Sequence, residues 1–272
     1  MLRPTSRDLV DVGVFGGSGF YSLLDDVEEI EVETPFGKPS GPIALGRIGQ
    51  TRLAFLPRHG KHHEFPPHSI NYRANIWAMA ELGATRILGP AAAGSLQPHV
   101  HPGDFVICDQ FVDRTSGRAS TFYDGPNTVH ISSADPYCPE LRALAAEACR
   151  EQGITVHPQG TVVIVEGPRF STRAESRWFS GLGWEVINMT QYPEVVLARE
   201  FELCYVNISL ITDYDVGFEG HPDVRPVTVD TVIKVFNENN NRVKAVIRSL
   251  APRIPAERSC ACGTALTSAV VS

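Results

Sequence analysis

Short apolar runs alternate along the chain with segments of helical periodicity, and this alternation restricts the fold more than any other feature of the sequence. Runs with the length of buried strands lie at 9–15, 42–48, 51–56, 85–89, 106–108, 162–165, 186–188 and 203–211. Helices are expected at 71–82, 139–152, 173–182, 193–200 and 229–250. Strands that alternate with helices predict an α/β fold, in which helices cover both faces of a central sheet.

The sequence contains no sign of a boundary between domains. Its 272 residues suit one large domain or two small ones, and they include no internal repeat, low-complexity tract or long linker. We therefore predict a single domain over 1–272, with a core at about 10–250 and a C-terminal tail at about 253–272.

The charge of the chain argues against several kinds of partner. A net charge of -7 and a pI of about 5.7 do not favour a surface for nucleic acid or an anionic membrane. No apolar stretch has the length needed to cross a bilayer. The basic residues within 1–8 precede no apolar region, so a signal peptide is not expected. These features predict a cytoplasmic enzyme.

Six cysteines are spread along the chain, at positions 108, 138, 149, 204, 260 and 262. This spacing is unlike the dense disulfide framework of a small secreted domain, so most are expected to be buried and reduced. Cys260 and Cys262 form a C-x-C pair in the tail, where a frayed end, a redox role and a metal role all stay open. Because one C-x-C pair supplies too few ligands for structural zinc, no metal site is predicted.

Two loops that follow predicted strands carry groups suited to an anion. Residues 16–19 (Gly-Gly-Ser-Gly) let backbone N–H groups approach a ligand, and Ser18 adds a hydroxyl donor. Residues 57–60 (Pro-Arg-His-Gly) add the guanidinium fork of Arg58 and His59 as a further donor. Either loop alone is more often an ordinary turn, but the two together favour a phosphate site.

Two further strand ends carry small or aromatic residues. The small side chains at 90–96 allow a ligand to lie against the backbone, or else they allow tight helix packing. Residues 165–171 place Phe170 where its ring can face a flat base, although a single phenylalanine is more often part of the core. Glu166 and Arg169 are expected to form an ion pair that shapes this loop.

Polar groups end the last two predicted strands before the C-terminal helix. In 188–194, Thr190 can donate to phosphate and Met189 can pack under a sugar, although methionine usually fills core space. Asp213 and Asp215 follow the longest apolar strand and point the same way if that strand continues. Paired carboxylates raise the pKa of one member, which then keeps a proton to donate. A metal site or a helix cap is the alternative.

Taken in order, these motifs resemble one known family. The segments are 16–20 (Gly-Gly-Ser-Gly-Phe), 57–60 with His63, 93–96 (Ala-Gly-Ser-Leu), 109–115 (Asp-Gln-Phe-Val-Asp-Arg-Thr), 166–171 (Glu-Gly-Pro-Arg-Phe-Ser), 188–190 (Asn-Met-Thr) and 212–215 (Thr-Asp-Tyr-Asp). Over about 10–250 they resemble the 5′-methylthioadenosine phosphorylase branch of the trimeric purine nucleoside phosphorylases. The resemblance implies a mixed, twisted sheet flanked by helices and a homotrimer. It also implies phosphorolysis of methylthioadenosine to adenine and 5-methylthioribose 1-phosphate, without metal or organic cofactor.

The resemblance implies roles for individual residues. The phosphate ligands would be Ser18, Arg58, His59, the amide of Ala92, and Thr190. The ribose and the base would contact Phe170, Ser171, Asn188 and Met189. The 5′-substituent would lie against Val229, Val232 and Ile233, with His130 reaching in from a neighbouring subunit. Asp213 would protonate N7 of the leaving base, and Asp215 would recognise the amino side of adenine.

One position departs from the family pattern, and three alternative functions stay open. Ala91 stands where many relatives have a threonine phosphate ligand, so either the affinity for phosphate is lower or Ser95 or the backbone supplies that donor. A 6-oxopurine phosphorylase is the nearest alternative, but carboxylates at 213 and 215 suit the amino group of adenine better. Another 5′-modified adenosine would fit the same pocket. A nucleoside-binding protein without catalysis would not need both an anion site and the acid Asp213.

Overall fold

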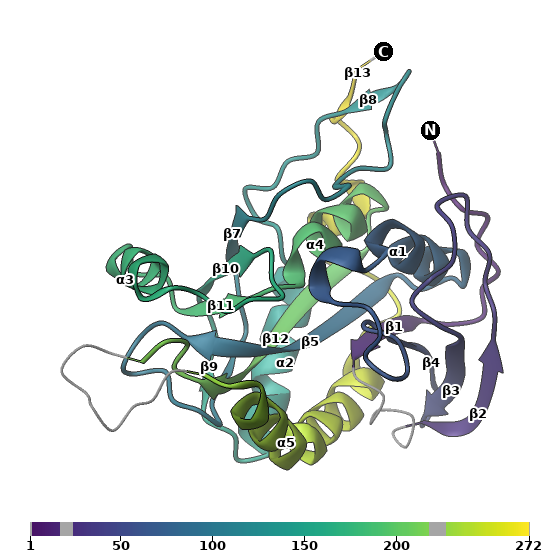
Figure 1. Cartoon of the computed structure of the whole chain (residues 1–272). Helices are drawn as coiled ribbons and strands as arrows, with labels where there is room; N and C mark the ends of the chain where they lie inside the picture. Colours follow the sequence, from purple (N-terminus) through teal and green to yellow (C-terminus); the bar gives the residue numbers. More distant parts are fainter. Residues whose placement is uncertain (1, 17–23, 218–226, 272) are drawn as a thin grey trace.

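A mixed, twisted sheet runs through the molecule (Figure 1). The computed structural model describes residues 2–16, 24–217 and 227–271. In chain order, the strands of this sheet are β1 (Val12–Gly16), β2 (Asp25–Ile30), β3 (Ile43–Ile48), β4 (Thr51–Pro57), β5 (Arg86–Ser95), β6 (Phe105–Val106), β7 (Gln110–Arg114), β9 (Val156–His157), β10 (Thr161–Val165), β11 (Val186–Asn188) and β12 (Cys204–Asp213). They lie in the order β2-β3-β4-β1-β5-β11-β10-β7, with β12 beside β5, β6 beside β12 and β9 beside β6.

Helices cover both faces of this sheet (Figure 1). They are α1 (Tyr72–Glu81), α2 (Pro139–Glu151), α3 (Arg173–Gly181), α4 (Gln191–Glu200) and α5 (Val229–Leu250). Helices α1 and α4 share one hydrophobic core, and α2 and α5 share another. Strand β12 separates the two cores: Tyr205 and Ile211 belong to the first, and Leu210 belongs to the second. The predicted α/β fold class is confirmed.

The helices begin and end within two residues of their predicted bounds. Their capping groups explain this agreement. The side chain of Asn71 accepts a hydrogen bond from the N–H of Ala74 at the start of α1. Thr172 and Glu175 form a capping box at the start of α3. Both caps are local in sequence, so periodicity and turn residues were enough to locate the helices.

Strand β5 is longer than the sequence predicted. The expected strand ended at 89, before the small residues, but the ladder with β12 continues and pairs Ser209 with Ala91 and Leu210 with Ala92. Small side chains allow this because β5 lies between packed layers of the fold. Ala91 and Ala92 therefore belong to a strand, whereas they were expected in a loop.

The sequence did not predict several strands, most of which are very short or lie in polar segments. Strand β2 lies at the edge of the sheet, and most of its acidic sequence is exposed, so no alternation marked it. The tail after 253 is also structured. It forms the 3-10 turn η4 (Ala261–Thr264) and then β13 (Val270–Val271), which pairs antiparallel with β8 (Thr128–Val129). Figure 1 shows β8 and β13 projecting together from the body of the molecule.

The neighbours of β5 change along its length, and this change positions the functional site. On one edge, β5 pairs with β1 through Leu88 and with β11 from Gly94 onward. Within the described residues, no strand pairs with this edge between these two positions. Open sheets bind ligands where neighbouring strands diverge in this way. No helix in the described part of the chain has the length and apolar character needed to span a membrane.

Candidate active site

A cavity of about 730 Å³ lies where β5 changes its neighbours. Its wall brings together predicted site residues from distant parts of the chain: Arg58, His59, Ala92, Phe170, Ser171, Asn188, Met189, Thr190, Asp213, Asp215, Val229 and Ile233. Most of them follow the strand ends that the sequence singled out. One cavity therefore contains the anion groups, the carboxylates and the apolar side chains.

The structure does not place two of the predicted site residues, and a third is not part of this cavity wall. Ser18 lies outside the described residues, and so does the side chain of Val232. His130 follows β8 on the projecting arm, where it is exposed and its N–H donates to the carbonyl of Ala269 at 2.8 Å. The cavity of this chain does not include His130 among its lining residues.

Asp213 ends β12 as a buried carboxyl, only 7% exposed. Its Oδ2 accepts from Thr212 Oγ1 at 2.6 Å, and its Oδ1 accepts from the N–H of Asp215 at 2.7 Å. Burial is the largest influence and raises the pKa of Asp213 to about 6, although both hydrogen bonds favour the ionised form. The sequence analysis expected repulsion from Asp215 to raise this pKa, but that repulsion is the smallest influence. Desolvation, rather than the neighbouring carboxylate, raises the pKa.

Asp215 lies beyond the end of β12, in a left-handed conformation with φ of 49°. The sequence analysis expected the two carboxylates to point the same way if the strand continued. The strand ends before Asp215, so that condition is not met. The side chain still lines the cavity, and burial raises its pKa above the ordinary value. Asp215 Oδ2 and Ser171 Oγ are buried without a hydrogen-bond partner among the described residues. The neighbouring hydroxyls of Ser176 and Ser171 act against the effect of burial on the pKa of Asp215, and the two side chains are suited to a polar ligand.

The backbone of β5 is close enough to Asp213 to require a glycine at position 94. A β-carbon on Gly94 would lie 2.9 Å from Asp213 Oδ1. Contacts this close between a carbon and an oxygen are repulsive, so any larger residue would displace the carboxyl group. The glycine in the Ala-Gly-Ser-Leu motif is therefore explained by the position of the acid.

Arg58 is fixed by a buried carboxylate that the sequence analysis did not identify. Its Nε and Nη2 donate to the two carboxylate oxygens of Glu194 at 2.7 and 2.8 Å, and its Nη1 donates to the carbonyl of Pro90 at 3.0 Å. Arg58 is 3% exposed and Glu194 is fully buried. Tyr205 OH also donates to Glu194. The guanidinium is thus fixed at the cavity wall, and the carboxylate of Glu194 balances its charge.

The tautomer of His59 is set by the backbone. Its Nδ1 lies 2.9 Å from the carbonyl oxygen of Phe65, which can only accept, so the proton is on Nδ1. Burial lowers the pKa of His59 to about 4, so the ring is neutral at pH 7. Its Nε2 is therefore a hydrogen-bond acceptor, whereas the sequence analysis expected a donor. The ring stacks on His63 with centroids 4.4 Å apart.

The structure also settles which group could replace the threonine that is absent at position 91. Ser95 Oγ donates to the carbonyl of Gln97 at 2.8 Å and is fully buried away from the cavity. The prediction that Ser95 could donate to phosphate in place of the threonine is therefore wrong. The backbone alternative stands, because Ala91 and Ala92 line the cavity on the part of β5 whose edge is free of strand pairing.

The turn after β11 presents polar and apolar groups side by side. Asn188 is 5% exposed, and its Oδ1 and Nδ2 have no partner among the described residues. Thr190 is the N-cap of α4, but its side chain makes no capping hydrogen bond. Met189 lies between them on the cavity wall. Buried polar groups without partners are uncommon in folded proteins, so these side chains are suited to a bound ligand.

Arg118 holds the loops beneath the cavity and was not found from the sequence. Its Nη1 donates to the carbonyl of Met189 at 2.9 Å, and its Nη2 donates to the carbonyl of Glu166 at 2.7 Å. Its Nε also pairs with the carboxylate of Glu166. The predicted Glu166–Arg169 pair is therefore wrong, since Arg169 pairs with Glu175. Backbone carbonyls carry no sequence signal, so no motif could have revealed Arg118.

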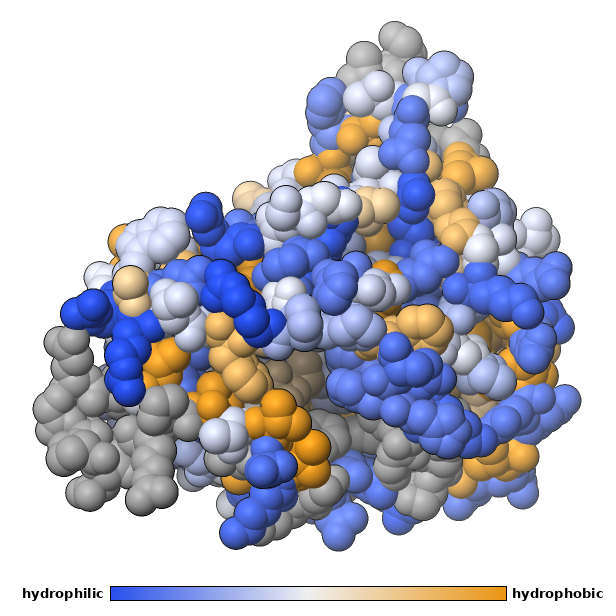
Figure 2. Space-filling view, in the orientation of Figure 1, coloured by the Kyte–Doolittle hydropathy of each residue, from blue (hydrophilic) through white to orange (hydrophobic). Residues whose placement is uncertain are grey.

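The mouth of the cavity is apolar and open. Val229 and Ile233, on the first turns of α5, are 59% and 52% exposed while they line the cavity. Figure 2 shows hydrophobic side chains gathered over this end of α5. Large apolar side chains that are exposed beside a cavity commonly mark a surface for a ligand or another protein.

Comparisons with known proteins agree on one family. A model of the phosphorylase superfamily matches residues 11–252. The S-methyl-5′-thioadenosine phosphorylase of Thermofilum pendens is 50% identical, over 96% of this chain and 99% of its own length. The purine nucleoside phosphorylase of Streptomyces coelicolor is also 50% identical, over 94% of both chains. A solved structure, methylthioadenosine phosphorylase from Schistosoma mansoni in complex with adenine, has a TM-score of 0.89 at 38% identity, covering 96% of this chain and 99% of that one.

Proposed function

The chain belongs to the phosphorylase superfamily, and from this premise we propose that it cleaves the N-glycosidic bond of 5′-methylthioadenosine with inorganic phosphate. The products are adenine and 5-methylthioribose 1-phosphate, so the enzyme is a pentosyltransferase. The observation that carries the proposal is the position of Asp213. This buried carboxyl, with a pKa of about 6, lines the same cavity as the fixed guanidinium of Arg58.

Asp213 supplies the proton that the reaction needs. Breaking the glycosidic bond builds positive charge on the sugar and negative charge on the purine. A carboxyl with a pKa near 6 keeps a substantial protonated fraction near neutral pH, and it can therefore protonate N7 of the departing adenine. Thr212 and the N–H of Asp215 hold the carboxyl in place. General-acid assistance of this kind contributes roughly 10²–10⁴-fold to the rate.

Phosphate is bound on the side of the cavity formed by β4 and β5. Arg58 has five N–H donors and uses three of them within the protein, so others stay available for phosphate. Ser18, Thr190 and the amide of Ala92 add further donors. His59 acts differently: its Nε2 accepts the hydrogen of a P–OH group and so orients HPO₄²⁻ with its ionised oxygens toward the donors.

The base and the ribose occupy the rest of the cavity. Asp215 accepts a hydrogen bond from the amino group of adenine, supported by its buried Oδ2 without a partner among the described residues. Ser171 and Asn188 offer further polar groups, and Phe170 and Met189 pack against the base and the ribose. Recognition by a carboxylate favours a 6-amino purine, because a carboxylate cannot donate to the O6 of hypoxanthine.

The 5′-methylthio group lies at the apolar mouth, against Val229, Val232 and Ile233. The exposure of Val229 and Ile233 supports a homotrimer in which His130 of a neighbouring subunit completes this pocket. His130 supports it too, because it is exposed on an arm outside its own chain's cavity. Sedimentation of the intact protein together with the activity of His130→Ala tests this assembly: we expect a trimer and a raised KM for methylthioadenosine.

The proposed reaction needs no metal ion or organic cofactor, because charge on the leaving base is met by the proton of Asp213. We further propose that it takes place in the cytoplasm, within purine and methionine salvage. Methylthioadenosine contains both an adenine and a methylthio group, so its cleavage returns both to metabolism.

A product assay with and without phosphate tests the proposed function. We expect release of adenine from methylthioadenosine only with phosphate, together with methylthioribose 1-phosphate. Adenine release without phosphate would indicate a hydrolase, and no release at all would indicate a binding protein. Asp213→Asn is the matched control, since it preserves the shape of the side chain and removes the acid.

A 6-oxopurine phosphorylase is the second candidate, because the Streptomyces relative named purine nucleoside phosphorylase is as similar as the methylthioadenosine phosphorylases. The same assay with inosine at matched concentration separates the two candidates. A kcat/KM for inosine above that for methylthioadenosine would favour the second.

A further inference from the structure

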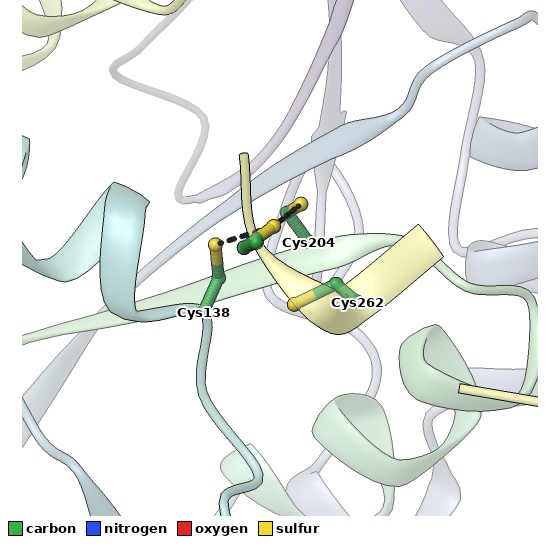
Figure 3. A group of neighbouring side chains, drawn as sticks. Cys138, Cys204 and Cys262 are labelled. Carbon is green, nitrogen blue, oxygen red and sulfur yellow. Dashed lines mark hydrogen bonds between the residues drawn. The ribbon is translucent and has the colours of Figure 1, made fainter. Parts of the chain in front are cut away.

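Four cysteines from three distant segments meet near the start of β12, at the opposite end of this strand from Asp213. They are Cys138, Cys204, Cys260 and Cys262, and their Sγ atoms all lie within 4.8 Å of one another. Figure 3 shows Cys138, Cys204 and Cys262 approaching one another from the start of α2, from β12 and from η4. The sequence showed only the C-x-C pair, which alone has too few ligands for a metal. The fold supplies the other two.

The distances between the sulfurs are close to those of a shared metal ligand set. Cys260 Sγ lies 3.6 Å from Cys138 Sγ and 3.4 Å from Cys204 Sγ. These separations are far longer than a disulfide bond of about 2.05 Å. In a tetrahedral zinc–thiolate site with bonds of about 2.3 Å, neighbouring sulfurs are about 3.8 Å apart. Cys260 is within hydrogen-bond distance of both other thiols, and small outward shifts of the sulfurs would bring the set to zinc–thiolate spacing.

The surroundings of the cluster are dry. Cys138, Cys204 and Cys262 belong to the hydrophobic core beneath α2 and α5, and Cys260 packs against it partly buried. Cys138 also occupies the N-cap position of α2 without a side-chain capping bond, and the helix dipole there favours a negatively charged ligand. A closed set of four sulfurs is typical of structural zinc sites, which keep no open position for substrate or water.

A buried cation beside the cluster gives a second, independent observation. Arg86 is 2% exposed, lies opposite Cys204 in the β5–β12 ladder, and donates to the carbonyls of Pro255 and Glu257 on the segment that leads to Cys260. Among the described residues it forms no ion pair, and its buried Nε has no hydrogen-bond partner. Burying a charge without a counter-charge is costly. A zinc ion with four thiolates carries a net charge of about −2 and would provide that counter-charge.

We propose that Cys138, Cys204, Cys260 and Cys262 bind one structural zinc ion. Each thiol loses its proton to solvent as its sulfur binds the metal, and no redox change occurs. The ion ties the C-terminal tail to the starts of α2 and β12. Because the tail continues from η4 into β13, which pairs with β8, the zinc also steadies the arm that carries His130.

The metal content of the protein tests this proposal. The full chain is purified with a thiol reductant, stripped with a chelator, and titrated with zinc alone. We expect one tightly bound zinc per chain, retained through gel filtration, and a Tm about 5–15 °C above that of the stripped protein. Cobalt(II) in place of zinc should give the strong absorption of a tetrahedral thiolate site.

Variants identify the ligands. Cys260→Ser with Cys262→Ser should lose stoichiometric zinc and the cobalt spectrum. Cys108→Ser with Cys149→Ser is the matched control, since these buried cysteines lie outside the cluster, and it should keep both. The titration of the unmutated protein does not depend on how well either variant folds.

Three results would overturn the proposal. The first is a reduced protein that takes up no zinc, which would leave the cluster as packed thiols. The second is freshly isolated protein whose intact mass is lower by two hydrogens per disulfide and which binds no zinc after reduction. The third is zinc that remains in the double variant.

Discussion

The deep half of the cavity and its mouth differ in how completely one chain builds them. In the deep half, Arg58 and Asp213 are 3% and 7% exposed, and protein groups fix their positions. At the mouth, Val229 and Ile233 are more than half exposed. The difference teaches that one chain completes the surroundings of the buried polar groups but leaves the apolar mouth uncovered. In the proposed function, the buried groups carry the charge chemistry and the mouth receives the 5′-substituent.

The largest effect should come from removing the acid of the deep half. Asp213→Asn keeps the size of the side chain and removes its proton, so kcat for methylthioadenosine should fall by about 10²–10⁴-fold with little change in KM. Steady-state kinetics at saturating phosphate measures the two constants. Loss of affinity with an unchanged kcat would remove Asp213 from the acid role.

Breaking the buried ion pair behind Arg58 should mainly affect stability. Glu194→Gln leaves the buried guanidinium with a neutral partner, so the free energy of unfolding should fall by about 3–5 kcal/mol. Urea unfolding followed by circular dichroism measures it, with KM for phosphate as a second readout. Glu175→Gln is the control, because its pair with Arg169 is at the surface and its loss should change little. Equal losses in both variants would show that burial is not the reason.

The mouth is tested by changing substrate and side chain together. Val229→Ser with Ile233→Ser should lower kcat/KM for methylthioadenosine by about 10–200-fold, because apolar contact with the methylthio group is lost. Adenosine, which has a 5′-hydroxyl, should lose much less. Lys234→Ser, an exposed change on the same helix, is the control. A similar loss for both nucleosides would mean that these side chains do not recognise the 5′-group.

The smallest effect is a pH dependence set by the deep half. Asp213 must be protonated to act, so kcat should fall about tenfold per pH unit above its pKa. That pKa is about 6 without ligand, and a bound phosphate anion should raise it further. A pH profile of kcat at saturating substrates measures this limb, which should be absent in Asp213→Asn. A limb that remains in the variant would belong to another group.

The raised pKa of Asp213 also predicts how the stability of the fold depends on pH. The pKa of Asp213 is raised from 3.8 to about 6 on folding, so the folded state binds the proton more tightly. The contribution of Asp213 therefore favours folding at low pH and is lost as pH rises from about 4 to about 6. Urea unfolding across this range, compared with Asp213→Asn, isolates it. A contribution that grew with pH would contradict the buried position of the carboxyl.

Two segments show how far prediction from sequence could go. Helix α1 was located because its cap, its periodicity and its end at Gly83 all lie within residues 71–83. Strand β5 was cut short because small residues carry no strand pattern, and only pairing with β12 shows that they belong to a strand. Most predicted site residues line one cavity for a related reason: they follow strand ends, which turn residues mark.

What the sequence determined by itself was therefore local: the alternating elements, the strand-end motifs, and the apolar and acidic side chains offered there. What only the tertiary structure decided depends on partners far apart in the chain. Glu194 balances Arg58, Arg118 holds two loops by their carbonyls, and Cys138 and Cys204 join the C-x-C pair. Burial, rather than the neighbouring aspartate, raises the pKa of Asp213. Burial and long-range pairing arise only when the chain packs, so no periodicity or spacing in the sequence records them.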